Sequence, residues 1–426
     1  MKRTAIRVES ISTYLERRVP GTHTIPLTPV FKRLAWSNLA AQSAEQIGLA
    51  AAPIFAVLAL GADAGEAGLL QTAQTLPFLL VSIPAGVLAD RLSRSRLLAA
   101  TEALRTVSLL IIVALAALNL LNLPVLALLG FVGACGTVAY SVTTPALIPG
   151  LVKAEDLSRA NAKIELARTA AFAAGPALGG ALVGWTGATT AFAWACGLSL
   201  CAVFLLSGVR EPQRATVPRR RLLHEIREGA SFVFNHNLLL PIFLTQFIFN
   251  VAFFILYAAY VPHALKWLHL SASEVGITLG IYGVGMVIGA LCAARIMHNL
   301  RLGVVIAIGP VAGLIGSLLL ALTIWAPSFM LAGLGFFFLG VGPILWVIST
   351  TTLRQTVTPS ALLGRVSAIN IVAYGARPIG AAIGAVVGGI YNAQVCLIVA
   401  VLAFALQAAV VLLSHLPRLV EQPAAP

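Results

Sequence analysis

The sequence predicts an all-α membrane protein with twelve transmembrane helices in two six-helix halves and both termini in the cytoplasm. Composition is the first observation that favours this fold. Hydrophobic residues make up 59% of the 426 residues and charged residues only 10%, and the mean hydropathy is +0.94. A soluble domain carries about a quarter charged residues, so this chain suits a bilayer better than water. The other two observations are twelve apolar segments of spanning length and an asymmetric placement of positive charge.

The span count follows from the apolar segments. A helix needs roughly 20 apolar residues to cross about 30 Å of hydrocarbon. Polar or turn-forming stretches, such as 61–65 and 119–124, interrupt the apolar pattern. The predicted spans are 36–61, 67–89, 97–119, 124–149, 162–185, 188–208, 239–262, 274–297, 303–325, 328–350, 367–390 and 393–415.

The orientation follows from the positive charges. If both termini are cytoplasmic, all but four of the 28 Lys and Arg residues lie in cytoplasmic tails, loops or their flanks. Lys266 falls in a loop on the opposite side, and Arg105, Arg168 and Arg377 lie inside spans. Lys and Arg gather in the cytoplasmic loops of membrane proteins. We therefore expect a multi-pass protein of a bacterial inner (plasma) membrane.

The same charge pattern limits the partners and the chemistry. The formal net charge of +13 comes from segments between apolar runs, so it is a topology signal and we expect no nucleic-acid partner. The five cysteines stand apart in apolar runs, which predicts neither a disulfide framework nor a metal site. We also expect no cofactor and no enzymatic activity, because the sequence holds no nucleophile–base set, metal cluster or cofactor loop.

A polar segment near the middle divides the chain. The run Arg219–Arg221 is followed by apolar residues at helical spacing, which predicts an amphipathic helix on the cytoplasmic membrane surface. A weak internal repeat of about 205 residues relates the Gly-rich fifth and eleventh spans, as repeats in transporters do. The predicted units are a cytoplasmic tail over 1–31, a six-helix half over 32–208, a linker over 209–238, a six-helix half over 239–415 and a tail over 416–426.

The stretch GVLADRLSRSR, 86–96, closes the second span and opens the next cytoplasmic loop. Gly86 would let a neighbouring helix approach closely, and Asp90 can pair with Arg91 or Arg94. A glycine, an Ala-Asp-Arg step and a basic loop at this junction resemble the signature of the major facilitator superfamily. The resemblance implies that Asp90 latches the two halves in the outward-facing state; alternatively, the arginines only hold the loop inside. The equivalent stretch at 289–301, GALCAARIMHNLR, has alanine in place of the acid.

The stretch GPALGG in the fifth span resembles the motif that marks antiporters of this superfamily. It contains Gly175, Pro176, Gly179 and Gly180; the proline would bend the helix and the glycines would allow close packing. Simple packing of a Gly-rich helix is the alternative. The resemblance implies export by exchange. We expect the proton to be the driving ion, because no set of residues in the sequence suggests a sodium site. No phosphate-binding GxxxxGK[ST] stretch occurs, which excludes ATP-driven transport by this chain itself.

Ionisable residues inside spans are candidate functional groups because their burial is costly. Glu45 lies in the first span, which lines the central cavity in the superfamily, so it can bind protons or substrate; a hydrogen-bonded structural acid is the alternative. Arg377 and Arg168 occupy corresponding spans of the two halves. A cation facing the cavity would attract an anionic substrate or hold Glu45 ionised. For Arg168, pairing with Glu165 is the simpler alternative.

Other polar positions within spans are less specific. Asn250 and Gln74 either line the pathway or bridge helices. Glu102 and Arg105 stand three residues apart in the third span and share a helix face, so we expect a structural ion pair there, with a functional role as the alternative. The aromatic pairs Phe253–Phe254 and Phe336–Phe338 are expected to face lipid.

These features together predict a monomeric secondary transporter that exports a small amphipathic molecule in exchange for protons. The stretches at 145–162 and 362–370 resemble the exporter branch that includes siderophore exporters and macrolide efflux pumps. The arginines slightly favour an anionic or catecholate-like cargo. Proton-coupled uptake of a metabolite, and a lipid flippase or non-transporting sensor on the same fold, are the alternatives.

Overall fold

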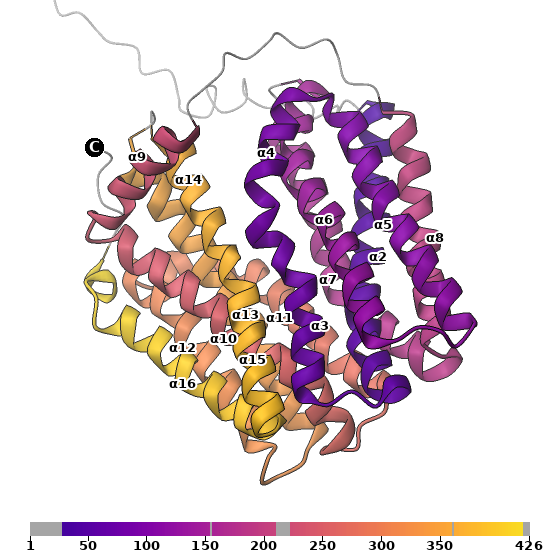
Figure 1. The fold of residues 1–426 in the computed structure, drawn as a ribbon. Coiled ribbons are helices and arrows are strands. Elements are labelled where there is room, and N and C mark those ends of the chain that lie inside the picture. Colours follow the sequence, from indigo (N-terminus) through magenta and orange to yellow (C-terminus); the bar gives the residue numbers. More distant parts are fainter. Residues whose placement is uncertain (1–27, 154–155, 210–221, 360–361, 421–426) are drawn as a thin grey trace, which may run out of the picture.

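The computed structural model describes residues 28–153, 156–209, 222–359 and 362–420, and these residues are almost entirely helical (Figure 1). The N-terminal group of helices is α2 (Pro29–Leu60), α3 (Ala64–Leu80), α4 (Ser82–Arg91), α5 (Arg94–Ala117), α6 (Leu123–Leu147), α7 (Leu157–Thr186) and α8 (Ala188–Ser207). The C-terminal group is α10 (Leu239–Lys266), α11 (Ala272–Asn299), α12 (Leu302–Leu322), α13 (Phe329–Val357), α14 (Leu363–Val372), α15 (Arg377–Ile390) and α16 (Ala393–Leu412). A short helix, α9 (Leu222–Phe234), precedes the second group, and η3 (Ala373–Ala376) joins α14 to α15.

Ten of the described helices are long and apolar enough to cross a membrane, and α3 with α4 makes an eleventh if the bent pair is one span. The pair bends by 45°. Pro84 explains the break, because it has no N–H for the carbonyl of Leu80 and its ring clashes there. The predicted second span, 67–89, thus corresponds to a bent pair of helices.

The eleventh predicted span, 367–390, is also broken. The structure divides this region among α14, η3 and α15, and α15 has 14 residues, too few to cross alone. Pro378 cannot donate to the carbonyl of Tyr374, which instead accepts from the backbone N–H of Arg377 in a tighter turn. The total of twelve spans stays a prediction.

The two groups of helices meet along two seams. Helix α7 packs on α11, and α3 packs on α15. A Cβ atom on Gly180 would lie 2.5 Å from the Cα atom of Gly276, and one on Gly68 would lie 2.5 Å from the Cα atom of Ala385. Glycine is therefore required at both seams, because any Cβ atom there would clash with the backbone of the opposite helix.

A lysine also joins the two groups of helices. The Nζ atom of Lys266, at the end of α10, donates to the carbonyl of Ala62 at 2.7 Å and to that of Gly61 at 3.4 Å. Gly61 ends α2 with a left-handed backbone, φ 71°. A cation suits the carbonyls exposed at a helix C-terminus. The lysine that stands apart in the charge pattern thus has a structural partner in the other group.

The outer surface of the bundle is apolar. Leu291 and Phe204 are each 77% exposed, and Leu402 is 64% exposed. Large side chains so exposed on long apolar helices are expected to face lipid, because water would disfavour a continuous surface of this kind.

The predicted linker helix is present as α9, and it docks on protein as well as lying at the bundle surface (Figure 1). It packs against α14, where Arg365 and Glu228 form an ion pair at 2.7 Å. A Cβ atom on Gly229 would lie 2.7 Å from the carbonyl oxygen of Arg365, so the contact is close. The run Arg219–Arg221 and the tail before Thr28 lie outside the described residues.

Candidate functional site

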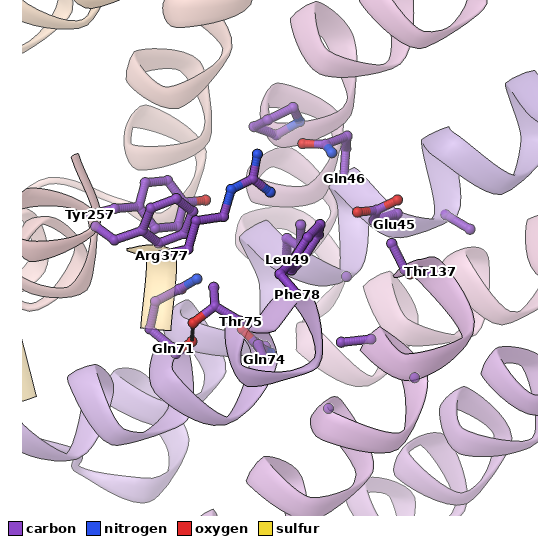
Figure 2. Close-up of a pocket in the computed structure, with 18 of the residues that line it drawn as sticks. Glu45, Gln46, Leu49, Gln71, Gln74, Thr75, Phe78, Thr137, Tyr257 and Arg377 are labelled. Atoms are coloured by element: carbon purple, nitrogen blue, oxygen red, sulfur yellow. Dashed lines mark hydrogen bonds between the residues drawn. The ribbon is translucent and has the colours of Figure 1, made fainter. Parts of the chain in front are cut away.

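A cavity of about 240 Å³ lies between the two groups of helices (Figure 2). Its walls come from α2, α3, α5, α6, α7 and α8 on one side and from α10, α11, α13 and α15 on the other. Most of the lining is apolar or aromatic, with a few amides and charged groups among it. Small-molecule sites typically combine these properties. The polar lining includes Glu45, Gln46, Gln71, Gln74, Arg105, Asn250 and Arg377.

The N-terminal side of the cavity carries a cluster of two carboxylates and one guanidinium. The Nη1 atom of Arg105 lies 3.7 Å from Glu45, and its Nη2 atom lies 2.6 Å from both carboxylate oxygens of Glu102. Arg105 also donates to the carbonyl of Ala41 at 2.8 Å, and Ser199 donates to Glu102 at 2.6 Å. The ion pair of Glu102 and Arg105 that the sequence indicates is present, and Glu45 extends it into the cavity.

The two acids of the cluster differ in access. The Glu102 side chain is 1% exposed and its carboxylate has hydrogen bonds from both Arg105 and Ser199. The Glu45 side chain is 15% exposed and lines the cavity, and Arg105 lies at ion-pair distance rather than hydrogen-bond distance from it. Glu45 is therefore the acid that a ligand or a proton entering the cavity reaches first.

The C-terminal side carries Arg377. Its Nε atom donates to the side-chain oxygen of Asn250 at 3.2 Å. The centre of its guanidinium lies 4.5 Å from the ring centroid of Phe78, 4.6 Å from that of Tyr374 and 5.6 Å from that of Phe254. Cation–π contacts of this kind stabilise a cation without neutralising it. Figure 2 shows Arg377 and Glu45 on different sides of the cavity.

Two glutamines in the cavity wall have buried atoms that lack hydrogen-bond partners. These atoms are Oε1 of Gln74 in α3 and Nε2 of Gln46 in α2. A buried amide group without a partner is costly, so these two atoms are candidates for hydrogen bonds with a polar ligand. The structure thus places Gln74 and Asn250 in the cavity lining. The sequence alone did not distinguish this position from a role in bridging two helices.

Arg168 does not line this cavity. It forms an ion pair with Glu165 three residues earlier on α7 and lies over the ring of Phe172, with 5.3 Å between the guanidinium carbon and the ring centroid. Phe172 itself lines the cavity. The structure therefore brings Arg168 to its simpler partner, and its predicted cavity role stays a prediction.

The aromatic residues show where the expectation from sequence is wrong. Phe253, Phe254 and Phe336 all line the cavity, and Phe336 is fully buried. A run of phenylalanines looks the same whether the helix turns it toward lipid or toward a ligand. The rotation of α10 and α13 about their axes places these rings inside. Phe338 lies outside the cavity lining and contacts Phe337.

The GPALGG stretch divides its contacts between two helices. A Cβ atom on Gly175 would lie 2.3 Å from the Cβ atom of Gln46, and one on Gly179 would lie 3.0 Å from the carbonyl oxygen of Ile47, both on α2. Gly180 forms the seam with α11, and Pro176 lines the cavity. The packing role is present, and α7 continues through the proline over Leu157–Thr186.

The 86–96 stretch contributes differently from the expectation. A Cβ atom on Gly86 would lie 4.0 Å from Val142, an ordinary contact, so the expected close helix approach is absent at this position. Arg94 donates to the carbonyls of Ala89 and Ala146, which ties α5 to α4 and α6 within one group, while Arg91 is exposed. The side chain of Asp90 lies outside the described residues, and its latch role stays a prediction.

A family model settles the general class of the chain. The model described as Major Facilitator Superfamily matches residues 34–384. The chain belongs to this superfamily. Its relatives and structural neighbours are transporters rather than enzymes.

Relatives in the superfamily include exporters. The enterobactin exporter EntS of Citrobacter koseri is 26% identical over 231 residues, which cover 53% of each chain. The multidrug efflux pump Tap of Mycobacterium bovis is 26% identical over 216 residues, 48% of this chain and 51% of the relative. The chain therefore spans about half the length of the curated relatives it matches.

Solved structures of other transporters match the fold over about nine-tenths of this chain. The nucleoside transporter NupG aligns with a TM-score of 0.73 at 13% identity, over 91% of this chain and 99% of that one. A bacterial homologue of the iron transporter ferroportin aligns with a TM-score of 0.69 at 18% identity, over 91% and 99%. At these identities the likeness shows the fold alone.

For this superfamily member, sequence reasoning missed several aromatic residues of the site. Phe78 beside Arg377 and Tyr282 on α11 both line the cavity and carry no sequence signal beyond apolar helical context. The missed contact between Arg105 and Glu45 had a usable signal, because two ionisable residues inside neighbouring spans tend to pair.

Proposed function

We propose that this chain is a secondary active exporter of a bacterial inner membrane that exchanges a small amphipathic molecule for protons. The observation that carries the proposal is Glu45, a carboxylate on a spanning helix that reaches the cavity and lies 3.7 Å from Arg105. Such an acid can bind a proton when the cavity faces one side and release it when the cavity faces the other.

Three features support export and the type of cargo. The similarity to EntS and Tap, although over about half of each chain, is to proteins named as exporters. The GPALGG stretch adds the antiporter resemblance. A cavity with many aromatic side chains and few polar groups suits a drug-like or siderophore-like molecule.

The proposed topology has twelve spans and both termini in the cytoplasm. It counts α3 with α4 as one bent span and α14, η3 and α15 as one broken span, in addition to the ten continuous helices. An even number of spans puts both termini on one side, where the positive charges gather. The two halves then correspond to 32–208 and 239–415, and they rock about the cavity as a monomer.

The test uses the purified full-length chain in liposomes with a pH gradient and a panel of antibiotics, dyes and siderophores. We expect cargo to accumulate in inside-acid vesicles when the protein's cytoplasmic face is outward. Glu45→Gln should abolish accumulation driven by the gradient yet keep exchange of labelled for unlabelled cargo. Asp90→Asn should slow both processes, because a latch residue affects the conformational change itself.

The matched control is Glu66→Gln. Glu66 lies in the first turn of α3, away from the cavity, and glutamine can keep its capping box with Asp63. Gradient-driven transport that survives in Glu45→Gln would refute the coupling role. Accumulation that instead requires an acidic outside on right-side-out vesicles would identify an uptake symporter.

A further inference from the structure

We propose that the cargo is dipolar: a cationic group faces Glu45, an anionic group faces Arg377, and an apolar ring system lies between them. The inference rests on the proposed transport function and names the chemical class of cargo for the same cavity. It follows from the balance of formal charge in the two walls of the cavity, taken one wall at a time.

The wall formed by the N-terminal group has an excess of one negative charge when both acids are ionised. Two carboxylates, Glu45 and Glu102, share the single guanidinium of Arg105. Both carboxylate oxygens of Glu102 accept from Arg105 at 2.6 Å and Oε1 also accepts from Ser199, so the guanidinium neutralises Glu102 more closely than it does Glu45 at 3.7 Å. The uncompensated charge therefore resides on Glu45, which is the acid exposed to the cavity.

The wall formed by the C-terminal group has one positive charge. Within the described part of the chain, no carboxylate lies within the 4.0 Å ion-pair distance of Arg377. Its contacts are the neutral amide of Asn250 and aromatic rings, among them Phe78. The nearby cation Arg168 is balanced by Glu165 and does not line the cavity, so it leaves this excess unchanged.

Closure of the cavity makes these two charges selective. A charge that loses water without gaining a partner is strongly unfavourable, so a ligand with one charge leaves the opposite wall uncompensated. A dipolar ligand compensates both walls. Its apolar body meets aromatic side chains such as Phe254 and Tyr257, which line the same cavity and favour a planar ring.

The same ligand would also couple binding to movement. Glu45 belongs to α2 in one group and Arg377 to α15 in the other, so a ligand that contacts both bridges the two groups. A ligand shifts a conformational equilibrium only through its different affinity for the two states. The bridging contacts are complete only when the walls approach, so a dipolar cargo stabilises the closed-cavity state. A proton on Glu45 competes with the cationic end, as an exchange mechanism requires.

The experiment compares matched ligands that share a ring and differ in charge. Calorimetry on the full-length protein in nanodiscs at neutral pH would measure binding of tryptophan, tryptamine and indole-3-propionate. A second series would consist of an amino acid, an amine and a carboxylic acid that share a naphthyl ring. We expect each amino acid to bind at least about tenfold more tightly than its singly charged analogues, which corresponds to about 1.4 kcal/mol.

Variants identify which wall each charge contacts. In Glu45→Gln the acid should bind as well as the amino acid, because the cationic end has lost its partner. In Arg377→Gln the amine should bind as well as the amino acid. Lys163→Gln removes an exposed cation of α7 outside the cavity and should preserve the preference of the wild type.

Three results would overturn the inference. One is a singly charged analogue that matches the amino acid in the wild type, and another is a preference that survives in Glu45→Gln or Arg377→Gln. The third is a folded protein that binds none of the six ligands. The proposed function is judged separately by proton-driven transport of the drug and siderophore panel, so an exporter of singly charged cargo would fail this test and pass that one.

Discussion

The two groups of helices repeat each other in backbone packing and differ in charge. Gly175 of α7 lies against Gln46 of α2, and Gly380 of α15 lies against Val251 of α10, each residue 205 positions after its counterpart. In the same register, Asn250 follows Glu45.

In the other helix of each pair, Arg377 occupies the position that corresponds to Phe172. Glu45, Asn250, Phe172 and Arg377 all line the cavity. The shared fold therefore places an acid of one half and an arginine of the other half in the wall of the same cavity. Symmetry sets the positions of the side chains, and the sequence of each half sets the chemistry.

The largest expected effect comes from the charge cluster of the N-terminal group. Arg105→Met would keep the bulk of the side chain and leave Glu102 and Glu45 without their cation. We expect a loss of about 3–5 kcal/mol in the free energy of unfolding, because the remaining charges are buried. Thermal unfolding in detergent measures this loss, and the double variant Arg105→Met/Glu102→Gln should recover part of it. An unchanged Arg105→Met variant would show that the cluster does not stabilise this half.

The seams should respond alike, because both depend on glycine. Gly180→Val and Gly68→Val each place a side chain where a Cβ atom alone would lie 2.5 Å from the opposite backbone. We expect each to cost about 1–3 kcal/mol of stability and to slow transport, since the close approach cannot form. Thermal unfolding and transport rates measure both. Gly86→Ala, where a Cβ atom has room, is the control. A large loss of stability at one seam and none at the other would show that the two seams do not depend on glycine to the same extent.

Giving Asn250 the residue type of its counterpart, Glu45, tests the charge difference between the halves directly. Asn250→Glu should place a carboxylate beside Arg377 and neutralise it, because the present amide oxygen already lies 3.2 Å from its Nε atom. We expect affinity for anionic ligands to fall about tenfold. Calorimetry with indole-3-propionate measures the change, and Asn250→Asp, with its shorter side chain, provides a graded comparison. Unchanged affinity would mean that Arg377 does not contact the anion.

The smallest effect should come from Arg168, which occupies the span of the N-terminal half that corresponds to the span of Arg377. Because Arg168 contacts Glu165 and lies outside the cavity lining, Arg168→Gln should change ligand affinity less than about twofold, against about tenfold for Arg377→Gln. Affinity and transport of the same cargo measure both variants. Equal losses in the two variants would return Arg168 to the cavity, as the sequence-based expectation has it.

The charged residues of the candidate site could be predicted from the sequence, and its aromatic residues could not. Glu45 and Arg377 stand out in sequence because a charge inside an apolar span is costly wherever it packs. Phe253 and Phe254 do not, because an aromatic side chain is equally suited to lipid and to a ligand cavity. Only the rotation of α10, set by its packing on α15 and α16, turns these rings inward.

The sequence by itself determined the membrane class, the approximate position of the spans and the family motif. Hydropathy and charge act residue by residue against the bilayer, so they can be read along one dimension. The tertiary structure decided which side chains meet: Arg105 with Glu45, Lys266 with the end of α2, and Gly180 with Gly276. These contacts join helices far apart in sequence. They depend on helix rotation, bends and the distance of closest approach, which arise only when all the helices pack together.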